Sequence, residues 1–298
     1  MNSPGKQSNG NGSWVRQWTR RVMTAGRTVG QGFSAMATDI AVLGRARTNG
    51  SVLRQRSTGE FKILVRTGEE VGRRIYYHGA LIEPEIDFVR DTIQPNDVCF
   101  DVGANVGYYT LLMAKLAPQG RVHAFEPVPL NYHLLSASVL ANGFTNVSVN
   151  QLAVSDSEGR ANFVLAEDSA YSSLRNTERK GVAREFQVAT TSLSQYCDRL
   201  GIHKVDFLKV DVEGAEEQVV SGARAILADP ARRPRVIMLE LYDPMLAKFG
   251  SSIPRMLDLM RSFRYTPSVY WRDSLVPYGP ELAARFENVL FHVGNNRG

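Results

Sequence analysis

The chain has 298 residues, of which 43% are hydrophobic and 22% are charged, and this composition excludes a wholly disordered protein. Its 25 glycines and 13 prolines exclude a fibrous repeat, and no apolar run approaches the roughly 18 residues of a membrane-spanning helix. The two cysteines, Cys99 and Cys197, are far apart and lack metal-ligand spacing. They favour a reducing compartment, so we expect a cytoplasmic protein.

Positive charge is concentrated at the start of the chain. Residues 1–57 hold nine of the 35 lysines and arginines but a single acid, Asp39. Glycine, serine and asparagine dominate the first dozen residues, so we expect a basic and partly disordered arm over 1–57. Such an arm is either a solvated tail or a weak contact with anionic membrane surfaces. We expect no nucleic-acid partner.

Residues 58–96 are expected to cap the fold with a small hairpin and a helix. The β-rich runs at 61–67 and 74–78 predict the two hairpin strands. A helix is predicted over 83–93, because Pro84 stands at an early helical position and apolar residues follow at helical spacing.

Residues 97–298 alternate between strands and helices and form the expected main domain. Strands are predicted at 98–102, 121–125, 146–153, 205–210, 235–241, 265–270 and 288–293, with extra β segments at 161–165 and 186–191. Helices are predicted at 106–116, 130–142, 192–200, 215–227 and 253–263. Repeated β-α-β order indicates a mostly parallel sheet of seven strands with helices on both faces. Ligands bind such sheets beyond the carboxyl ends of the strands.

The first strand of this domain ends in a glycine turn, Asp101-Val102-Gly103-Ala104-Asn105-Val106-Gly107, and a helix follows at once. Gly103 lets a ligand approach the backbone, and the helix start offers free N–H groups. A dinucleotide fingerprint needs glycines at 103, 105 and 108, but the chain has Asn105 and Tyr108. The turn therefore disfavours a nicotinamide- or flavin-dependent oxidoreductase.

The second strand ends in Glu126-Pro127. An acid at this place, beside the glycine turn of the neighbouring strand, is positioned to bind ribose hydroxyls. Pro127 ends the strand. Together the two strand ends favour a nucleoside-containing ligand over a plain structural turn.

These segments resemble the class I S-adenosylmethionine-dependent methyltransferases. Two further segments, Ala153-Val154-Ser155-Asp156 and Lys209-Val210-Asp211-Val212-Glu213-Gly214-Ala215-Glu216, narrow the resemblance to the FkbM type over residues 97 to 293. The resemblance implies a Rossmann-like α/β fold, S-adenosylmethionine as cofactor and methyl transfer to oxygen. It implies a hydroxylated small-molecule acceptor, such as a saccharide or another natural product. By position, it assigns cofactor binding to Asp101, Gly103, Asn105, Gly107, Glu126, Pro127, Ala153 and Asp156.

The fourth strand carries the residues best suited to the chemistry. Methyl transfer to a hydroxyl needs an oriented acceptor and a group that removes its proton. Asp211 is our first candidate, with Glu213 beside it and Glu240 on the next strand. These acids are alternatively structural ion pairs, sugar ligands or a chelate for Mg²⁺, and we assign no metal. Lys209, inside the same strand, needs an acidic partner such as Asp101 or Glu240.

The polar loop at 166–184 has the length and composition of an acceptor-binding lid, although a plain surface loop is equally compatible. A different class of function also remains open. The chain is then a non-catalytic binding module that reaches membrane or nucleic acid through residues 1–57, and the salt dependence of that binding would identify it.

Overall fold

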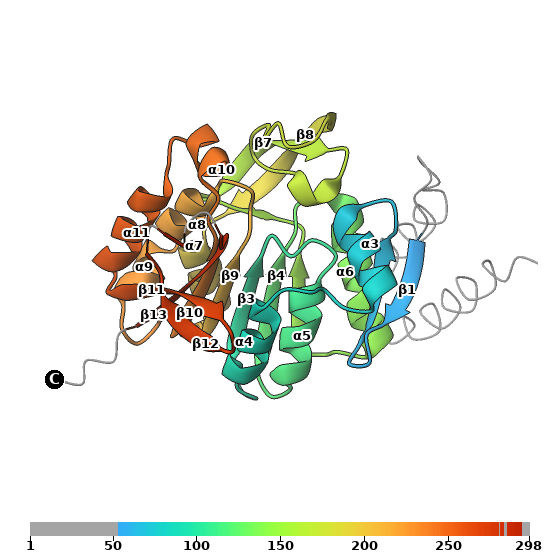
Figure 1. The fold of residues 1–298 in the computed structure, drawn as a ribbon, viewed down its shortest axis with the longest axis horizontal. Coiled ribbons are helices and arrows are strands. Elements are labelled where there is room, and N and C mark those ends of the chain that lie inside the picture. Colours follow the sequence, from blue (N-terminus) through green and yellow to red (C-terminus); the bar gives the residue numbers. More distant parts are fainter. Residues whose placement is uncertain (1–52, 280, 283–284, 294–298) are drawn as a thin grey trace, which may run out of the picture. The chain divides into compact units, whose positions relative to one another are not determined.

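The computed structural model describes residues 53–293, except 280, 283 and 284. Its centre is an eight-stranded sheet with the order β12-β11-β13-β10-β9-β3-β4-β5 (Figure 1). The expected Rossmann-like α/β arrangement is confirmed. No helix within the described ranges has the length and apolar character that crossing a membrane requires. Most of the expected basic arm, residues 1–52, lies outside the described residues.

Five neighbouring strands of the sheet run parallel. They are β5 (Val147–Asn150), β4 (Arg121–Phe125), β3 (Val98–Val102), β9 (Phe207–Val210) and β10 (Val236–Glu240). β13 (Asn288–Val293) is antiparallel and lies between β10 and β11 (Tyr265–Trp271). All four residues of β9 are buried, as expected for a parallel strand covered on both faces. The parallel strands end at one common edge, where the glycine turn, Glu126 and the acids at the ends of β9 and β10 lie.

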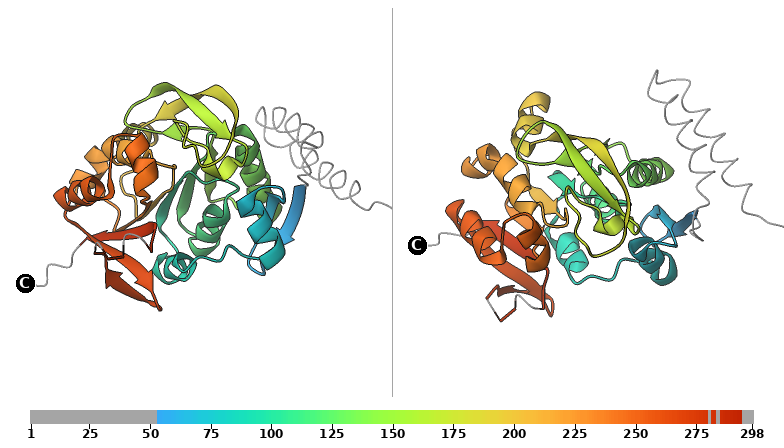
Figure 2. Two further views of the ribbon diagram at one scale, coloured as in Figure 1. Left: turned by 45° about the horizontal axis from the view of Figure 1, so that its top comes forward. Right: turned by 90° about the horizontal axis from the view of Figure 1, so that it is seen from above.

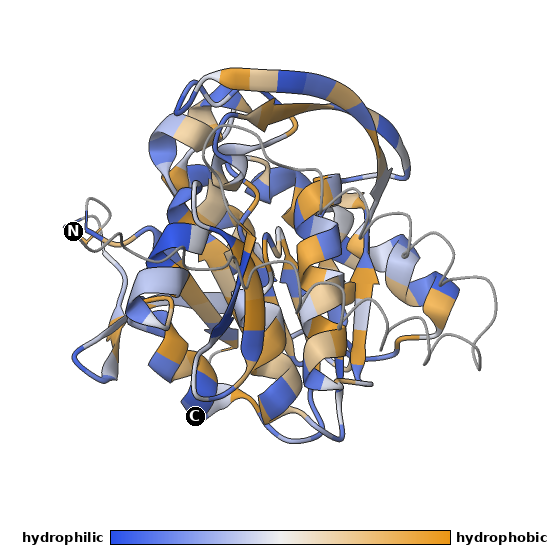
Figure 3. Ribbon diagram, turned by 90° about the vertical axis from the view of Figure 1, so that its right-hand side faces the viewer, coloured by the Kyte–Doolittle hydropathy of each residue, from blue (hydrophilic) through white to orange (hydrophobic). Residues whose placement is uncertain are grey.

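Helices cover both faces because right-handed crossovers that move in opposite directions along the sheet fall on opposite sides. One layer holds α4 (Glu85–Thr92), α5 (Tyr108–Leu116) and α6 (Pro129–Asn142). The other holds α7 (Leu193–Leu200), α8 (Glu216–Gly222), α9 (Arg224–Ala228) and α11 (Ile253–Ser262) (Figures 1 and 2). A short helix, α10 (Asp243–Lys248), follows β10. Hydrophobic residues populate the central strands and the adjoining helices (Figure 3).

A second, smaller sheet lies beyond the carboxyl ends of β3 and β4. Its strands are β6 (Ala153–Val154), β7 (Gly159–Ala166) and β8 (Val182–Thr191), and β7 and β8 form a long hairpin (Figure 1). The segment 167–181 joins these two strands and contains one short 3₁₀ turn, Ser169–Tyr171. The predicted strand at 146–153 is thus divided between two sheets.

The predicted hairpin at 61–67 and 74–78 is wrong. β2 (Lys62–Arg66) pairs instead with β1 (Leu53–Ser57), which precedes it, and residues 70–78 form the helix α3 (Glu70–His78). The two tyrosines at 76 and 77 suggest a strand, but the buried residues Gly72 and Ile75 are three positions apart, which is helical spacing. A side chain at Gly72 would meet the Arg66 carbonyl oxygen at 2.1 Å, so this contact with β2 requires glycine.

The sheet has one strand more than the seven predicted. β12 (Ser274–Pro277) pairs antiparallel with β11 at the sheet edge. Arg272 and Asp273, between the two strands, have φ values of 51° and 59°. Left-handed conformations at both positions are typical of a tight type I′ hairpin turn, which usually carries Asn-Gly. Because Arg-Asp is an unusual sequence for such a turn, the sequence did not predict this hairpin.

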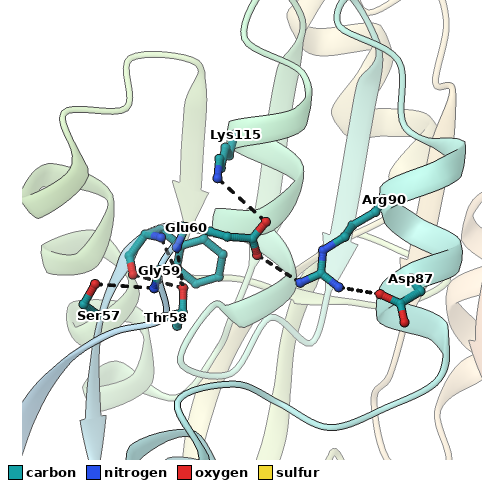
Figure 4. Close-up of polar contacts among 8 residues, drawn as sticks. Ser57, Thr58, Gly59, Glu60, Asp87, Arg90 and Lys115 are labelled. Atoms are coloured by element: carbon teal, nitrogen blue, oxygen red, sulfur yellow. Dashed lines mark hydrogen bonds and ion pairs between the residues drawn. The ribbon is translucent and has the colours of Figure 1, made fainter.

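Polar contacts attach the β1–β2 hairpin to the main domain. The Glu60 carboxylate lies between Lys115 of α5, at 3.7 Å, and Arg90 of α4, at 3.0 Å (Figure 4). Arg90 also contacts Asp87 at 2.6 Å. The hairpin turn is therefore fixed to two helices of the layer that covers β3 and β4.

Candidate functional site

The site begins with the turn between β3 and α5. Gly103 has a φ of 77°, and a β-carbon there would meet the Asp211 carbonyl oxygen at 1.8 Å. Gly107 has a φ of 91°, and a β-carbon there would meet Leu135 of α6 at 2.1 Å. Both positions therefore require glycine. The first allows β9 to approach the turn closely, and the second allows α6 to do so.

Glu126 follows β4 and reaches back to the same turn. One of its carboxylate oxygens accepts the Asn105 N–H at 2.8 Å, and the other accepts the Val128 N–H at 2.8 Å. Burial raises the pKa of Glu126 to about 7, although these backbone hydrogen bonds oppose the shift. Asn105 itself has a left-handed φ of 51°. The acid and the glycine turn thus form one unit at adjoining strand ends.

A cavity of about 610 Å³ opens at this edge of the sheet. Eight of the predicted site residues line it: Gly103, Asn105, Glu126, Pro127, Ala153, Asp211, Glu213 and Glu240. Three others do not: Asp101, Gly107 and Asp156. The cavity is large enough for a ligand of cofactor size.

The residues outside the cavity have other surroundings. Asp101 is fully buried, accepts a hydrogen bond from the Thr110 hydroxyl and lies 3.8 Å from Lys209 Nζ. Burial raises its pKa, and Lys209 opposes the shift. Asp156 is exposed and accepts a hydrogen bond from Ser157. Asp101 therefore supports the site from behind, one layer away from any ligand in the cavity.

The three candidate catalytic acids lie together. Asp211, Glu213 and Glu240 each offer an oxygen within 4.8 Å of the others. Burial raises the pKa of Glu213 to about 8, and burial and the nearby Asp211 raise that of Glu240 well above its usual value. Glu213 has a φ of 56°, a left-handed conformation that is costly for a residue with a side chain. Such strain often accompanies functional sites.

Two cationic side chains form ion pairs with this acidic cluster. Lys209 Nζ lies 3.0 Å from Asp211, and Arg179 lies 2.9 Å from Glu213. Burial lowers the pKa of Lys209, but the carboxylates of Asp211 and Asp101 outweigh this and raise it overall. Carboxylate oxygens are suitable ligands for Mg²⁺. Two of the three acids already have a cationic side chain beside them. Their negative charge therefore does not require a metal ion to balance it.

Sequence reasoning missed several residues that line the cavity. Glu83 and Glu85, at the start of α4, enter it from one side, and Trp271 enters from β11. The Tyr109 hydroxyl donates to Glu83 at 2.7 Å, and the Tyr109 ring covers Lys209. Two glutamates around a proline were a weak signal for a site. The approach of Glu83 to α5 has no signature in the local sequence.

The segment 167–181 also lines the cavity. Its Arg179 stacks on the rings of Tyr171 and Tyr242 and pairs with Glu213. On the opposite side, the Tyr171 hydroxyl donates to Glu70 of α3 at 2.6 Å. The segment therefore spans the site from α3 to α10. This position is compatible with the expected role as an acceptor-binding lid.

The model of the methyltransferase FkbM domain matches residues 101–267, which is more than half of the chain. The chain belongs to the FkbM methyltransferase family. It is 28% identical over 181 residues to the 31-O-demethyl-FK506 methyltransferase FkbM of Streptomyces tacrolimicus, covering 51% of this chain and 67% of the relative. It is 26% identical over 184 residues to the 2-O-methyltransferase NoeI of Sinorhizobium fredii, covering 57% of this chain and 73% of the relative.

A third relative, the methyltransferase sdnD of Sordaria araneosa, is 31% identical over 156 residues, covering 43% of this chain and 60% of the relative. Among solved structures, an O-methyltransferase from Bacillus cereus is similar, with 11% identity and a TM-score of 0.37 over 94% of this chain and 99% of that one. At this level of similarity, the sheet order described above remains the evidence for the fold.

Proposed function

We propose that this methyltransferase uses S-adenosylmethionine and methylates a hydroxyl of a saccharide or another small natural product. The observation that carries the proposal is the joint position of Gly103 and Glu126 at one cavity on adjoining parallel strands. The residues fit the cofactor: Gly103 lets the turn pack against Asp211 at the edge of the cavity, and the Glu126 carboxylate suits the ribose hydroxyls. Ala153 and Val154 offer apolar surface to the adenine.

When bound, S-adenosylmethionine supplies a methyl group on a positively charged sulfur. The chain must then orient the acceptor hydroxyl and take its proton. We assign the second task to Asp211, which lines the cavity at the end of β9. Lys209 holds the Asp211 carboxylate from the buried side, and Glu240 forms a hydrogen bond with it. Glu213, paired with Arg179, helps to bind the acceptor.

The choice of an oxygen acceptor is supported by two of the relatives, whose names describe O-methyltransferases. The acidic residues beside the cavity also suit an acceptor with several hydroxyls, because carboxylates accept hydrogen bonds from them. Weak contact of residues 1–57 with anionic membranes stays a separate proposal that does not affect the chemistry.

Calorimetric titration with S-adenosylhomocysteine and S-adenosylmethionine tests the cofactor assignment directly. We expect saturable binding of both at one site. A labelled methyl group supplied with saccharide and natural-product fractions, with and without a chelator, then tests the acceptor class. Complete absence of cofactor binding by the folded protein would overturn the proposal.

A further inference from the structure

Part of the cavity wall comes from outside the matched family segment. Residues 101–267 supply the glycine turn, Glu126 and the catalytic acids. The segment before it contributes Glu83 and Glu85, and the segment after it contributes Trp271 and Glu287. These two segments therefore add acidic and aromatic side chains to the cavity from outside the family match.

Carboxylates greatly outnumber cations around the cavity. Its lining includes eight acids: Glu70, Glu83, Glu85, Glu126, Asp211, Glu213, Glu240 and Glu287. The lining cations are Arg74, Arg179 and Arg285. Arg179 forms an ion pair with Glu213, and Arg285 stacks on the rings of Trp271 and Phe286. Arg74 acts electrostatically on both Glu70 and Glu83.

Of these acids, only Asp211 and Glu213 have a cationic partner at ion-pair distance among the described residues. The other six lining acids, which include Glu83, Glu85 and Glu240, have none within that part of the chain. Glu85 is only 4% exposed, and burial raises its pKa and that of Glu83. A buried carboxylate without a counter-charge is costly, so the group is held in its neutral form or awaits a cation. Even when Lys209, the partner of Asp211, is counted with the three arginines, the single net positive charge of S-adenosylmethionine leaves more acids than cations at the cavity.

We infer that the acceptor carries a protonated amine beside the hydroxyl that is methylated, as an amino sugar or an aminocyclitol does. Glu83, just before α4, and Glu240, at the end of β10, both line the cavity and bind the ammonium group. Both act electrostatically on Asp211, which places them around the acceptor hydroxyl. Trp271 and Phe286 line the cavity and offer apolar surface to the carbon skeleton. This inference rests on the proposed function and names its substrate class.

The test compares matched sugars that differ only in whether the amine is free. Glucosamine, galactosamine and mannosamine are titrated into protein saturated with S-adenosylhomocysteine, beside their N-acetyl forms, and binding is followed by ligand-observed NMR. We expect each free amine to bind at least about tenfold more tightly than its capped form, because one charge-assisted hydrogen bond is worth about that factor. The same preference is expected in the rate of labelled methyl transfer.

Two variants and one control locate the effect. Glu83→Gln and Glu240→Gln should each abolish most of the preference, since the amide keeps the size of the side chain but not its charge. Asp87→Asn should keep it, because Asp87 lies on the same helix as Glu85 but is exposed and pairs with Arg90. Circular dichroism and the binding of S-adenosylhomocysteine establish that each variant is folded.

The outcomes separate the inference from the proposed function. If S-adenosylhomocysteine binds but the amines bind no better than their capped forms, or neither binds, the inference is wrong and the methyltransferase proposal stands. The inference is also wrong if the preference survives both glutamine variants, or if Mg²⁺ rather than an amine tightens the complex. Failure of S-adenosylhomocysteine to bind would remove both.

Discussion

Replacing Glu126 with alanine tests most directly whether this residue binds the cofactor. In the proposed complex its two carboxylate oxygens bind two ribose hydroxyls, and hydrogen bonds to a charged group are worth about 1.5–3 kcal/mol each. Their loss predicts a dissociation constant for S-adenosylhomocysteine that is larger by roughly 10² to 10⁴-fold. Isothermal titration calorimetry measures this change.

The same substitution also affects the protein without a ligand. The N–H groups of Asn105 and Val128 lose their acceptor, at a cost of about 1–3 kcal/mol each when they stay buried and unpaired. Urea unfolding measures this loss, and Glu126→Gln, which keeps one acceptor oxygen, serves if the alanine variant does not fold. Glu185→Ala is the matched control, because Glu185 is exposed on β8 and outside the cavity.

We expect the control to bind like the wild type and to change stability by no more than about 0.5 kcal/mol. A folded Glu126→Ala protein that binds S-adenosylhomocysteine as tightly as the wild type would refute the assignment of Glu126 to the ribose. Equal weakening by Glu185→Ala would show that the effect is one of net charge and not of a specific contact.

Three further results are expected. Asp211→Asn should slow methyl transfer by roughly 10² to 10⁴-fold in single-turnover assays and leave the affinity for S-adenosylhomocysteine nearly unchanged; equal losses in both would contradict its role as base. Gly103→Ala should lower the free energy of unfolding in urea by at least about 2 kcal/mol, because of its left-handed φ and the contact with the Asp211 carbonyl. Gly143→Ala, equally left-handed at 69° but in open space, should cost clearly less, and similar costs would argue against the close contact. Finally, the unliganded protein should lose stability as pH rises from about 5 to about 8. In this window Glu126 and Glu213, whose pKa values are raised to about 7 and about 8, keep protons in the folded state that the unfolded chain has lost. A flat or rising urea midpoint over this range would contradict these raised pKa values.

Sequence reasoning succeeded where a structural feature is encoded locally. The glycine turn after β3, the acid after β4, the two acids after β9 and the acid that ends β10 were all predicted at strand ends, and all contribute to one cavity. It failed at the N-terminal cap, where two tyrosines suggested a strand and the chain forms α3. Local propensity was weaker there than the packing of Gly72 and Ile75 against β2.

The sequence by itself determined most strands and helices of the main domain, the family and the edge of the sheet at which the candidate site lies. It could do so because hydrophobic periodicity and glycine turns act over a few neighbouring residues. Only the tertiary structure decided that Asp101 lies behind the cavity, that Lys209 joins it to Asp211, and that Glu83 and Arg179 enter the site from segments far apart in the chain. Those relations depend on how separate elements pack and on which way their side chains point, and no local pattern of residues encodes either.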